Sequence, residues 1–282
     1  MFMIQFNDVT FKYPDDPSDL DKAGNPIINK PVFEHFTGTI PSSFTSLVGP
    51  NGCGKTTFMM LASGRLIPQN GNVKLFDQNI GALGEQQKNL VASVIYQNME
   101  FETQQPANEL LSYVYKNGNF RGNAKGIEDR DLLAEVTEVF ELGNVLSRPL
   151  QKLSKGEIQR TLLAFSLLYG SMSIFMDEPL FAMEFKQKEN SLNYLKKFSN
   201  ETGTPMYISI HELELSKKYA DNVLLFYPNR DMTFGSPEEV LTKDDLEKAY
   251  GVPYGMLKDQ EEMNRQTFSE INKNFGQQTP LD

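Results

Sequence analysis

A short apolar strand that runs straight into a glycine-rich loop decides the fold of this chain. The stretch reads Phe44-Thr45-Ser46-Leu47-Val48, followed by Gly49-Pro50-Asn51-Gly52-Cys53-Gly54-Lys55-Thr56-Thr57. Its first five residues favour a β-strand, and Phe58–Arg65 after the loop favours a helix. The order strand, Gly-x4-Gly-Lys-Thr, helix is what a phosphate-binding loop requires, so it outweighs the alternative of a simple glycine-rich turn.

The residue types of this loop suit phosphate chemistry. Glycines let the backbone wrap around phosphate oxygens, while the N–H groups and the helix N-terminus offer partial positive charge. Lys55 is expected to place a full charge on the β- and γ-phosphates, and the Thr56 hydroxyl to ligate Mg²⁺. We therefore expect MgATP to be held by Gly49, Asn51, Gly52, Cys53, Gly54, Lys55, Thr56 and Thr57.

Composition narrows the class of protein. The chain has 282 residues, enough for one large or two modest domains, and a formal net charge of −10, which argues against a nucleic-acid partner. One cysteine excludes an intrachain disulfide, and two histidines make zinc chemistry an unfavourable interpretation. No apolar run approaches the roughly 20 residues that cross a bilayer, and the first residues lack the pattern of a signal peptide. We expect a cytoplasmic protein.

Strands alternate with helices along the chain, which predicts a parallel α/β core. Met3–Phe11 is expected to be a half-buried strand, and Asp15–Pro31 an exposed excursion. Further strands are expected at Val91–Tyr96, Ser173–Met176 and Pro205–Ile210. Further helices are expected at Asp129–Leu142, Lys155–Leu168 and Lys188–Ser199, and the polar tail from Gln260 is expected to be only partly ordered.

An acidic pair closes the apolar strand Ser173–Met176. Ligands collect at the carboxyl ends of parallel strands, so Asp177 is expected to face the phosphate loop as a partner of Mg²⁺. Glu178 is the candidate general base for the attacking water. A solvated turn is the alternative for such a strand end, and the phosphate loop earlier in the chain favours the catalytic interpretation.

A third motif narrows the family. The run before the acidic strand reads Leu153-Ser154-Lys155-Gly156-Glu157-Ile158-Gln159-Arg160. It resembles the signature motif of ATP-binding cassette (ABC) proteins, Leu-Ser-Gly-Gly-Gln, with Lys155 and Glu157 as departures. In that family the signature of one subunit caps the γ-phosphate bound by the other, which implies ATP contacts for Ser154 and Gly156. Lys155 would add positive charge near that phosphate or point into solvent. The Glu157 carboxylate would repel the phosphate unless it lies at the rim of the site.

The resemblance implies further site residues. Tyr13 is similar to the aromatic that stacks on adenine, with a buried strand-end tyrosine as the alternative. Gln97 resembles the glutamine that touches Mg²⁺ and water and senses the membrane partner, and His211 resembles the switch histidine of the γ-phosphate. The loop Phe181-Ala182-Met183-Glu184 departs from the family's Ser-Ala-Leu-Asp, which puts coupling between the two sites in doubt.

The resemblance covers about residues 3 to 257 and implies the whole architecture. We expect a phosphate-loop α/β core, an N-terminal antiparallel β portion, and a helical subdomain over about 98–155, together one ABC ATPase domain over 1–258 with a tail over 259–282. The chain would pair with an identical or different cassette and drive separate membrane permease subunits from the inner face of the membrane. Asp221–Leu225 and later motifs resemble cassettes of metal-chelate and vitamin importers.

Two rival interpretations remain open at this stage. One is a soluble cassette ATPase without a transporter, as in iron–sulfur assembly. The other is a regulatory cassette with little turnover, suggested by Lys155, Glu157 and Glu184, against which Lys55 and Glu178 argue. The transported solute and the direction of transport have no signature in this sequence.

Overall fold

The computed structural model describes residues 2–18, 20, 24–97, 99, 103–119, 130–259 and 261–263. Two sheets form the centre of the molecule, one antiparallel and one mostly parallel. The antiparallel sheet belongs to the N-terminal third of the chain, as expected for the β portion. It has four strands in the order β2-β1-β4-β5, which span Phe33–Pro41, Phe2–Phe11, Asn70–Leu75 and Gln78–Asn79.

The larger sheet has six strands in the order β10-β9-β3-β8-β7-β6. In that order the strands span Met232–Gly235, Asn222–Phe226, Phe44–Val48, Met206–Ser209, Ser173–Met176 and Ala92–Ile95. The five strands from β9 to β6 run parallel, and β10 pairs antiparallel to β9. Strands β3 and β7 therefore end at one edge of the sheet, where the phosphate loop and the acidic pair follow them.

Helices surround the parallel sheet. They are α1 (Lys55–Ala62), α2 (Glu85–Val91), α3 (Ala107–Asn117), α4 (Leu132–Val139), α5 (Lys155–Tyr169), α6 (Phe185–Thr202), α7 (Leu213–Tyr219), α8 (Pro237–Val240) and α9 (Lys243–Tyr250). Within the described ranges, two short 3-10 helices span Ile80–Ala82 and Leu150–Lys152. Among the helices described, none has both the length and the apolar character needed to cross a bilayer.

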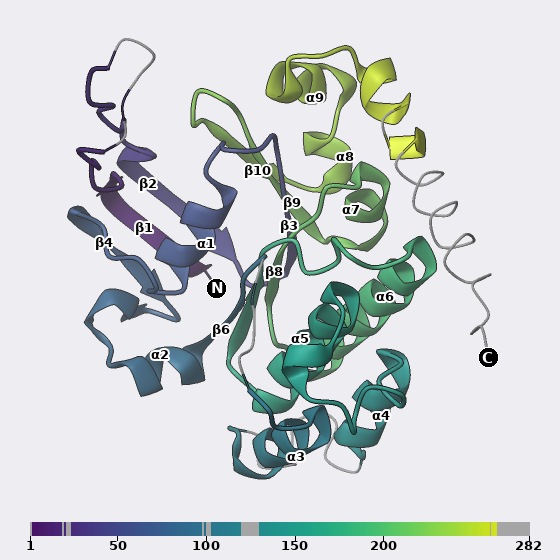
Figure 1. Cartoon of the computed structure of the whole chain (residues 1–282). Helices are drawn as coiled ribbons and strands as arrows, with labels where there is room; N and C mark the ends of the chain where they lie inside the picture. Colours follow the sequence, from purple (N-terminus) through teal and green to yellow (C-terminus); the bar gives the residue numbers. More distant parts are fainter. Residues whose placement is uncertain are drawn as a thin grey trace.

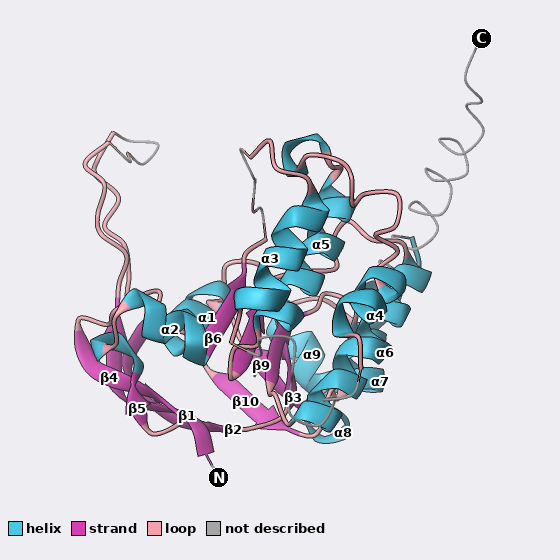
Figure 2. Ribbon diagram, turned by 90° about the horizontal axis from the view of Figure 1, so that it is seen from below, coloured by secondary structure: helices cyan, strands magenta, loops and turns pink. Residues whose placement is uncertain are grey.

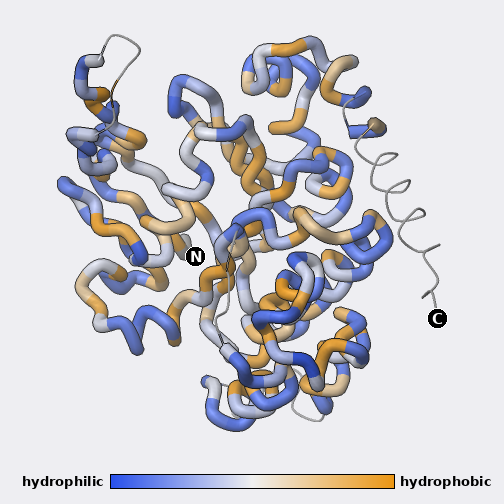
Figure 3. The backbone as a smooth tube through the Cα atoms, viewed as in Figure 1, coloured by the Kyte–Doolittle hydropathy of each residue, from blue (hydrophilic) through white to orange (hydrophobic). Residues whose placement is uncertain are grey.

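Both faces of the parallel sheet are covered, which explains why its central strands read as short apolar runs. Phe175 and Tyr207 point into a core shared with α1 and the antiparallel sheet. Their neighbours Ile174 and Ile208 point into a second core shared with α5 and α6. Figure 1 shows α1 and α5 on opposite sides of the sheet, and Figure 3 shows the apolar strands between them. The fold is the expected α/β architecture.

The C-terminal helices α8 and α9 cover the part of the parallel sheet that β3 and β9 form. Side chains from α8 and α9, including Val240 and Leu246, pack with Val48, Val223 and Leu225 in a third core. Most of the polar tail expected from Gln260 onward lies outside the described residues.

Several expected boundaries differ from those observed. The helix after the loop begins at Lys55 and ends at Ala62 rather than spanning Phe58–Arg65, because the loop leads directly into it at Gly54 and the chain turns at Gly64 with φ +72°. The expected strand Val91–Tyr96 shortens to β6 because Val91 ends α2.

Among the later helices, α4 is shorter than the expected span, whose first residue, Asp129, lies outside the described part. The Asp131 carboxylate caps α4 by accepting from Ala134 N at 3.1 Å, so the helix begins at Leu132. Helix α6 is longer than expected at both ends and stops at Gly203, with φ +70°.

The expected excursion between the first two strands leaves the sheet as an arm of loop, visible in pink in Figure 2. Its base is held by Asn29, whose N–H donates to Asp15 Oδ1 at 2.8 Å and whose side chain donates to Pro14 O at 2.8 Å. One isolated bridge joins Leu20 and Pro26 farther out.

Candidate nucleotide site

The loop between β3 and α1 has the backbone that an anion site requires. Gly49 has φ +146°, and a Cβ there would lie 2.7 Å from the carbonyl oxygen of Phe226. Gly54 has φ +111° and is the N-cap of α1, so the N-terminus of the helix opens onto the loop. Both glycines are therefore required by backbone geometry.

Lys55 is folded into this loop. Its side chain is buried, and its Nζ donates to Gly49 O at 2.7 Å and to Pro50 O at 2.9 Å. Both acceptors are neutral carbonyl oxygens, so the charge of Lys55 is available to attract an anion. Burial raises the pKa of the neighbouring Cys53 thiol, which keeps this side chain neutral in the loop.

Thr56 and Asp177 meet although they are 121 positions apart in the chain. The Thr56 hydroxyl donates to Asp177 Oδ2 at 2.5 Å. Asp177 follows β7 at the edge where the phosphate loop follows β3, and it is buried. Burial raises the pKa of its carboxyl above the ordinary value. A hydroxyl and a buried carboxylate side by side are oxygen ligands of the kind that a hard divalent cation takes.

Glu178 is held from both sides. Its Oε1 lies 2.6 Å from Nε2 of His211, and its Oε2 accepts from Nε2 of Gln97 at 2.5 Å. The hydrogen bond to His211 lowers the pKa of the Glu178 carboxyl, which keeps it ionised. Glu178 also has φ +49°, a left-handed conformation that costs energy outside glycine and clusters at functional sites.

Tyr13 lies beside the loop rather than in the core. Its hydroxyl is 3.1 Å from Thr57 Oγ1, and its ring packs edge-on against Phe11 with centroids 5.0 Å apart. The residue is 39% exposed, so a ring face remains accessible next to the phosphate loop. This placement disfavours the alternative of a buried strand-end tyrosine.

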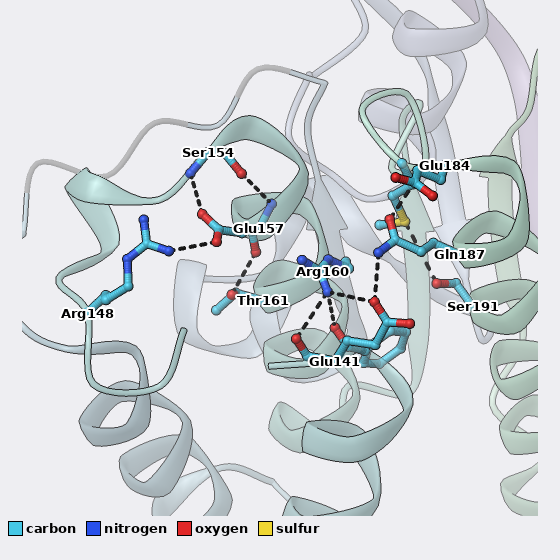
Figure 4. A network of polar contacts seen from close by, with 11 residues as sticks. Glu141, Arg148, Ser154, Glu157, Arg160, Thr161, Glu184, Gln187 and Ser191 are labelled. Atoms are coloured by element: carbon cyan, nitrogen blue, oxygen red, sulfur yellow. Dashed lines mark hydrogen bonds and ion pairs between the residues drawn. The ribbon is translucent and has the colours of Figure 1, made fainter. Parts of the chain in front are cut away.

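The signature segment forms the start of α5, away from the phosphate loop. The Ser154 hydroxyl accepts from Glu157 N at 3.3 Å, and the Glu157 carboxylate accepts in return from Ser154 N at 2.7 Å. The other Glu157 oxygen accepts from Arg148 at 2.6 Å (Figure 4). Glu157 is thus turned back onto its own helix, which resolves the difficulty of a carboxylate near phosphate, and Lys155 is exposed to solvent.

The second glycine of the signature packs on the loop that departs from the family. A Cβ at Gly156 would lie 2.6 Å from the carbonyl oxygen of Ala182, so the two segments are in close contact. Phe181, next to Ala182, is 55% exposed. Glu184 begins α6 as its N-cap residue.

A further contact anchors the signature helix to α6. Arg160 donates to the Phe140 and Glu141 carbonyl oxygens at 2.8 and 3.1 Å, and to the Glu141 carboxylate at 3.4 Å. The same carboxylate accepts from Gln187 of α6 at 2.7 Å (Figure 4). No sequence motif marks Glu141 or Gln187, because the three side chains come from separate elements.

The structure thus brings together most of the expected site at one edge of the sheet. This edge holds the phosphate loop together with Tyr13, Gln97, Asp177, Glu178 and His211. Ser154 and Gly156 lie instead at the start of α5, on the other face of the sheet. Sequence reasoning missed Arg230, whose Nη1 donates to Gly52 O at 2.5 Å. It lies in a turn far along the chain and no motif marks it.

These features define a class of protein. A parallel sheet that delivers a glycine-rich loop, a lysine, and a strand-end acidic pair to one edge is the architecture of a phosphate-loop nucleotide-binding protein.

Comparison with known proteins adds the family. Residues 38–181 match the family model described as ABC transporter, which is half of the chain, and the chain belongs to that family. It binds ATP and hydrolyses it as the ATP-binding subunit of a transporter.

Two curated relatives and one solved structure are similar to the chain over most of its length. The petrobactin import ATP-binding protein of Bacillus subtilis (strain 168) is 26% identical over 224 residues, 78% of this chain and 87% of the relative. The hemin import ATP-binding protein of Hahella chejuensis (strain KCTC 2396) is 27% identical over 224 residues, 77% and 85% of the two chains. A bacterial ABC transporter cassette solved as a dimer has a TM-score of 0.63 at 23% identity, over 79% of this chain and 94% of that one.

Proposed function

We propose that this cassette binds ATP with Mg²⁺ at the edge of the parallel sheet and hydrolyses it there with Glu178 as general base. The Glu178 carboxylate lies between His211 Nε2 at 2.6 Å and Gln97 Nε2 at 2.5 Å, beside the Thr56–Asp177 pair. This arrangement is the observation that carries the proposal. Lys55 and the loop N–H groups hold the phosphates, and Tyr13 stacks on adenine.

The side chains around Thr56 fit Mg²⁺. The Thr56 hydroxyl and the buried Asp177 carboxylate are ligands that Mg²⁺ takes together with phosphate oxygens and water. The Gln97 side chain, which is hydrogen-bonded to the next residue, Glu178, would add its amide oxygen. Burial raises the pKa of Asp177, and a divalent cation would favour its ionised form. Bound there, Mg²⁺ would neutralise negative charge on the phosphates.

The chain's own groups then supply the proton chemistry. The lowered pKa of Glu178 keeps its carboxylate ionised and able to accept a proton from an attacking water. Gln97 and His211 fix the carboxylate, so little rearrangement is needed when water arrives. The Lys55 ammonium group would stabilise the negative charge that develops on the transferred phosphate.

Catalysis is proposed to need two cassettes. Ser154 and Gly156 lie on α5, across the sheet from α1, so the signature of one chain can reach phosphates held by another chain rather than its own. The N-terminus of α5 offers partial positive charge for that contact, because it begins a helix of 15 residues. The partner would be a second copy or a different cassette, placed head to tail.

The transport role extends the same proposal. We assign one ABC ATPase domain to residues 1–258, with a helical subdomain over about 98–155 that contacts separate membrane permease subunits, and a tail over 259–282. The two curated relatives are named for import of petrobactin and of hemin. Together with the resemblance to metal-chelate importers, these names support import of a metal chelate as the function served here. The cassette would then lie at the inner face of the cell membrane.

The test is MgATP hydrolysis by the purified chain over a series of protein concentrations, beside Glu178→Gln, with light scattering in ATP. Wild type is expected to turn over with more than first-order dependence on protein. Glu178→Gln is expected to lose at least about 100-fold in rate yet form an ATP-dependent dimer. Wild type that binds ATP but neither dimerises nor hydrolyses it would contradict the proposal and favour a regulatory cassette.

A further inference from the structure

An arginine outside the expected site touches the phosphate loop. Arg230 lies in the turn between β9 and β10, and its Nη1 donates to the carbonyl oxygen of Gly52 at 2.5 Å across 178 positions of sequence. The turn is tight: Arg230 N donates to Tyr227 O at 3.0 Å, and Tyr227 N to Asp231 O at 3.0 Å. In Figure 1 this turn lies near the chain that leads from β3 into α1.

The backbone of Arg230 is held in an unfavourable conformation. Its φ is +74°, in the left-handed region that costs a non-glycine residue energy and persists where surrounding contacts impose it. The neighbouring Asp231 carboxylate accepts from Asn229 at 2.6 Å, so its hydrogen bond is made within the turn. The guanidinium reaches instead to a neutral carbonyl of the loop.

The contact controls the direction of a loop N–H group. Gly52 C=O and Cys53 N–H belong to one planar peptide, and the described residues contain no cis peptide bond, so the two groups point in opposite directions. A carbonyl held toward Arg230 turns the Cys53 N–H to the other side. Hydrogen bonding to a cation also polarises the peptide, which makes that N–H a stronger donor to an anion.

The guanidinium adds charge close to the loop. Its Nη1 would lie 3.8 Å from a Cβ at Gly54, the N-cap of α1, and its charge acts to lower the pKa of the Cys53 thiol against the larger effect of burial. A full positive charge beside the loop attracts a polyphosphate bound there, whatever the effective dielectric of the site.

We infer that Arg230 is a positioning residue for nucleotide binding, which orients the Gly52–Cys53 peptide of the phosphate loop and adds positive charge behind it. This inference rests on the proposed role of the loop in holding phosphates. The N–H groups of such a loop cradle the α- and β-phosphates, which ATP and ADP share, so Arg230 contributes to the affinity for both nucleotides and little to the chemical step.

The experiment measures the Kd of ATP and of ADP by isothermal titration calorimetry in EDTA, and kcat with saturating MgATP. The variants are Arg230→Ala, Arg230→Lys and Lys55→Ala. Lys243→Ala is the matched control, because it removes the same charge from a side chain that is 67% exposed on α9. Melting temperatures establish that each variant folds. If Arg230→Ala does not fold, Arg230→Lys replaces it in the comparison.

Arg230→Ala is expected to weaken binding of both nucleotides by about tenfold, as loss of a charge-assisted hydrogen bond implies, with kcat within about twofold of wild type. Arg230→Lys should recover part of the affinity, since it keeps the charge but not the planar donor set. Binding equal to that of Lys243→Ala would overturn the inference. A loss for ATP alone would also overturn it, because Arg230 would then contact the γ-phosphate directly. Undiminished binding by Lys55→Ala would instead contradict the proposed role of the loop.

Discussion

The Nε2 atom of His211 lies 2.6 Å from Oε1 of Glu178, and this contact is the largest cause of the lowered pKa of that carboxyl. The histidine follows β8 and the glutamate follows β7, which are paired parallel strands. The pairing of these strands therefore brings His211 to Glu178 and so lowers the pKa of the candidate general base.

Replacing His211 with alanine is expected to lower kcat by about tenfold or more and to raise the pKa of Glu178. Because hydrolysis needs ionised Glu178, activity falls as pH falls through that pKa, and the acidic limb of the kcat profile should move to higher pH. Gln97→Ala is the control, since its contact is a smaller cause of the shift. An acidic limb that stays in place in His211→Ala would show that the histidine does not tune the carboxyl.

Thr56→Val should raise the Mg²⁺ concentration for half-maximal ATPase activity by about tenfold or more, because it removes a proposed metal ligand and the hydrogen bond that orients Asp177. Thr56→Ser retains an oxygen at the same place and should behave nearly as wild type. The measurement is a Mg²⁺ titration at fixed ATP. Equal titration curves for the valine and serine variants would contradict the assignment.

Glu157→Ala should lower the free energy of unfolding by about 1 kcal/mol, because Ser154 N loses its acceptor at the start of α5. Glu157→Gln keeps an acceptor and loses mainly the ion pair with Arg148, which is 40% exposed and contributes little. Urea unfolding measures both. If the two variants were destabilised alike and both changed the KM for ATP, Glu157 would face the nucleotide instead of its own helix.

Gly156→Ala places a methyl group 2.6 Å from the carbonyl oxygen of Ala182, so the signature and the following loop must separate. The expected result is a loss of about 1–3 kcal/mol in stability and a fall in kcat, with ATP binding by the single chain retained. Gly143→Ala is the matched control, because a Cβ there meets nothing within 4 Å. Thermal unfolding and ATPase assays compare the two, and equal behaviour would rule out the close contact.

The stability of the fold should depend on the ionisation of Glu178. Its folded pKa is lowered below 4.5, so its contribution is fully present above about pH 4.5 and is lost as pH falls through the folded value. The difference in unfolding free energy between wild type and Glu178→Gln should therefore be constant near neutral pH and shrink in more acidic buffer. Urea titrations across pH measure it, and a difference that grew on acidification would have the wrong sign.

The amino-acid sequence by itself determined the local backbone structure of this protein. Strands β3 and β7 have the bounds that the apolar runs predict, and the loop between β3 and α1 follows from glycines that alone tolerate its backbone. Glycine conformation, strand composition and helix periodicity act over a few residues, so they can be read along the chain. Helix ends were predicted less well, because caps such as Asp131 decide them through single hydrogen bonds.

Only the tertiary structure decided which distant groups meet. Thr56 reaches Asp177 across 121 positions, and Arg230 reaches Gly52 across 178. The order of the parallel strands sets these distances, since it brings the ends of β3, β7 and β8 to one edge and the β9–β10 turn to the same loop. No periodicity in the sequence encodes that order, because it is settled by how the antiparallel sheet and the helices bury both faces of the parallel sheet.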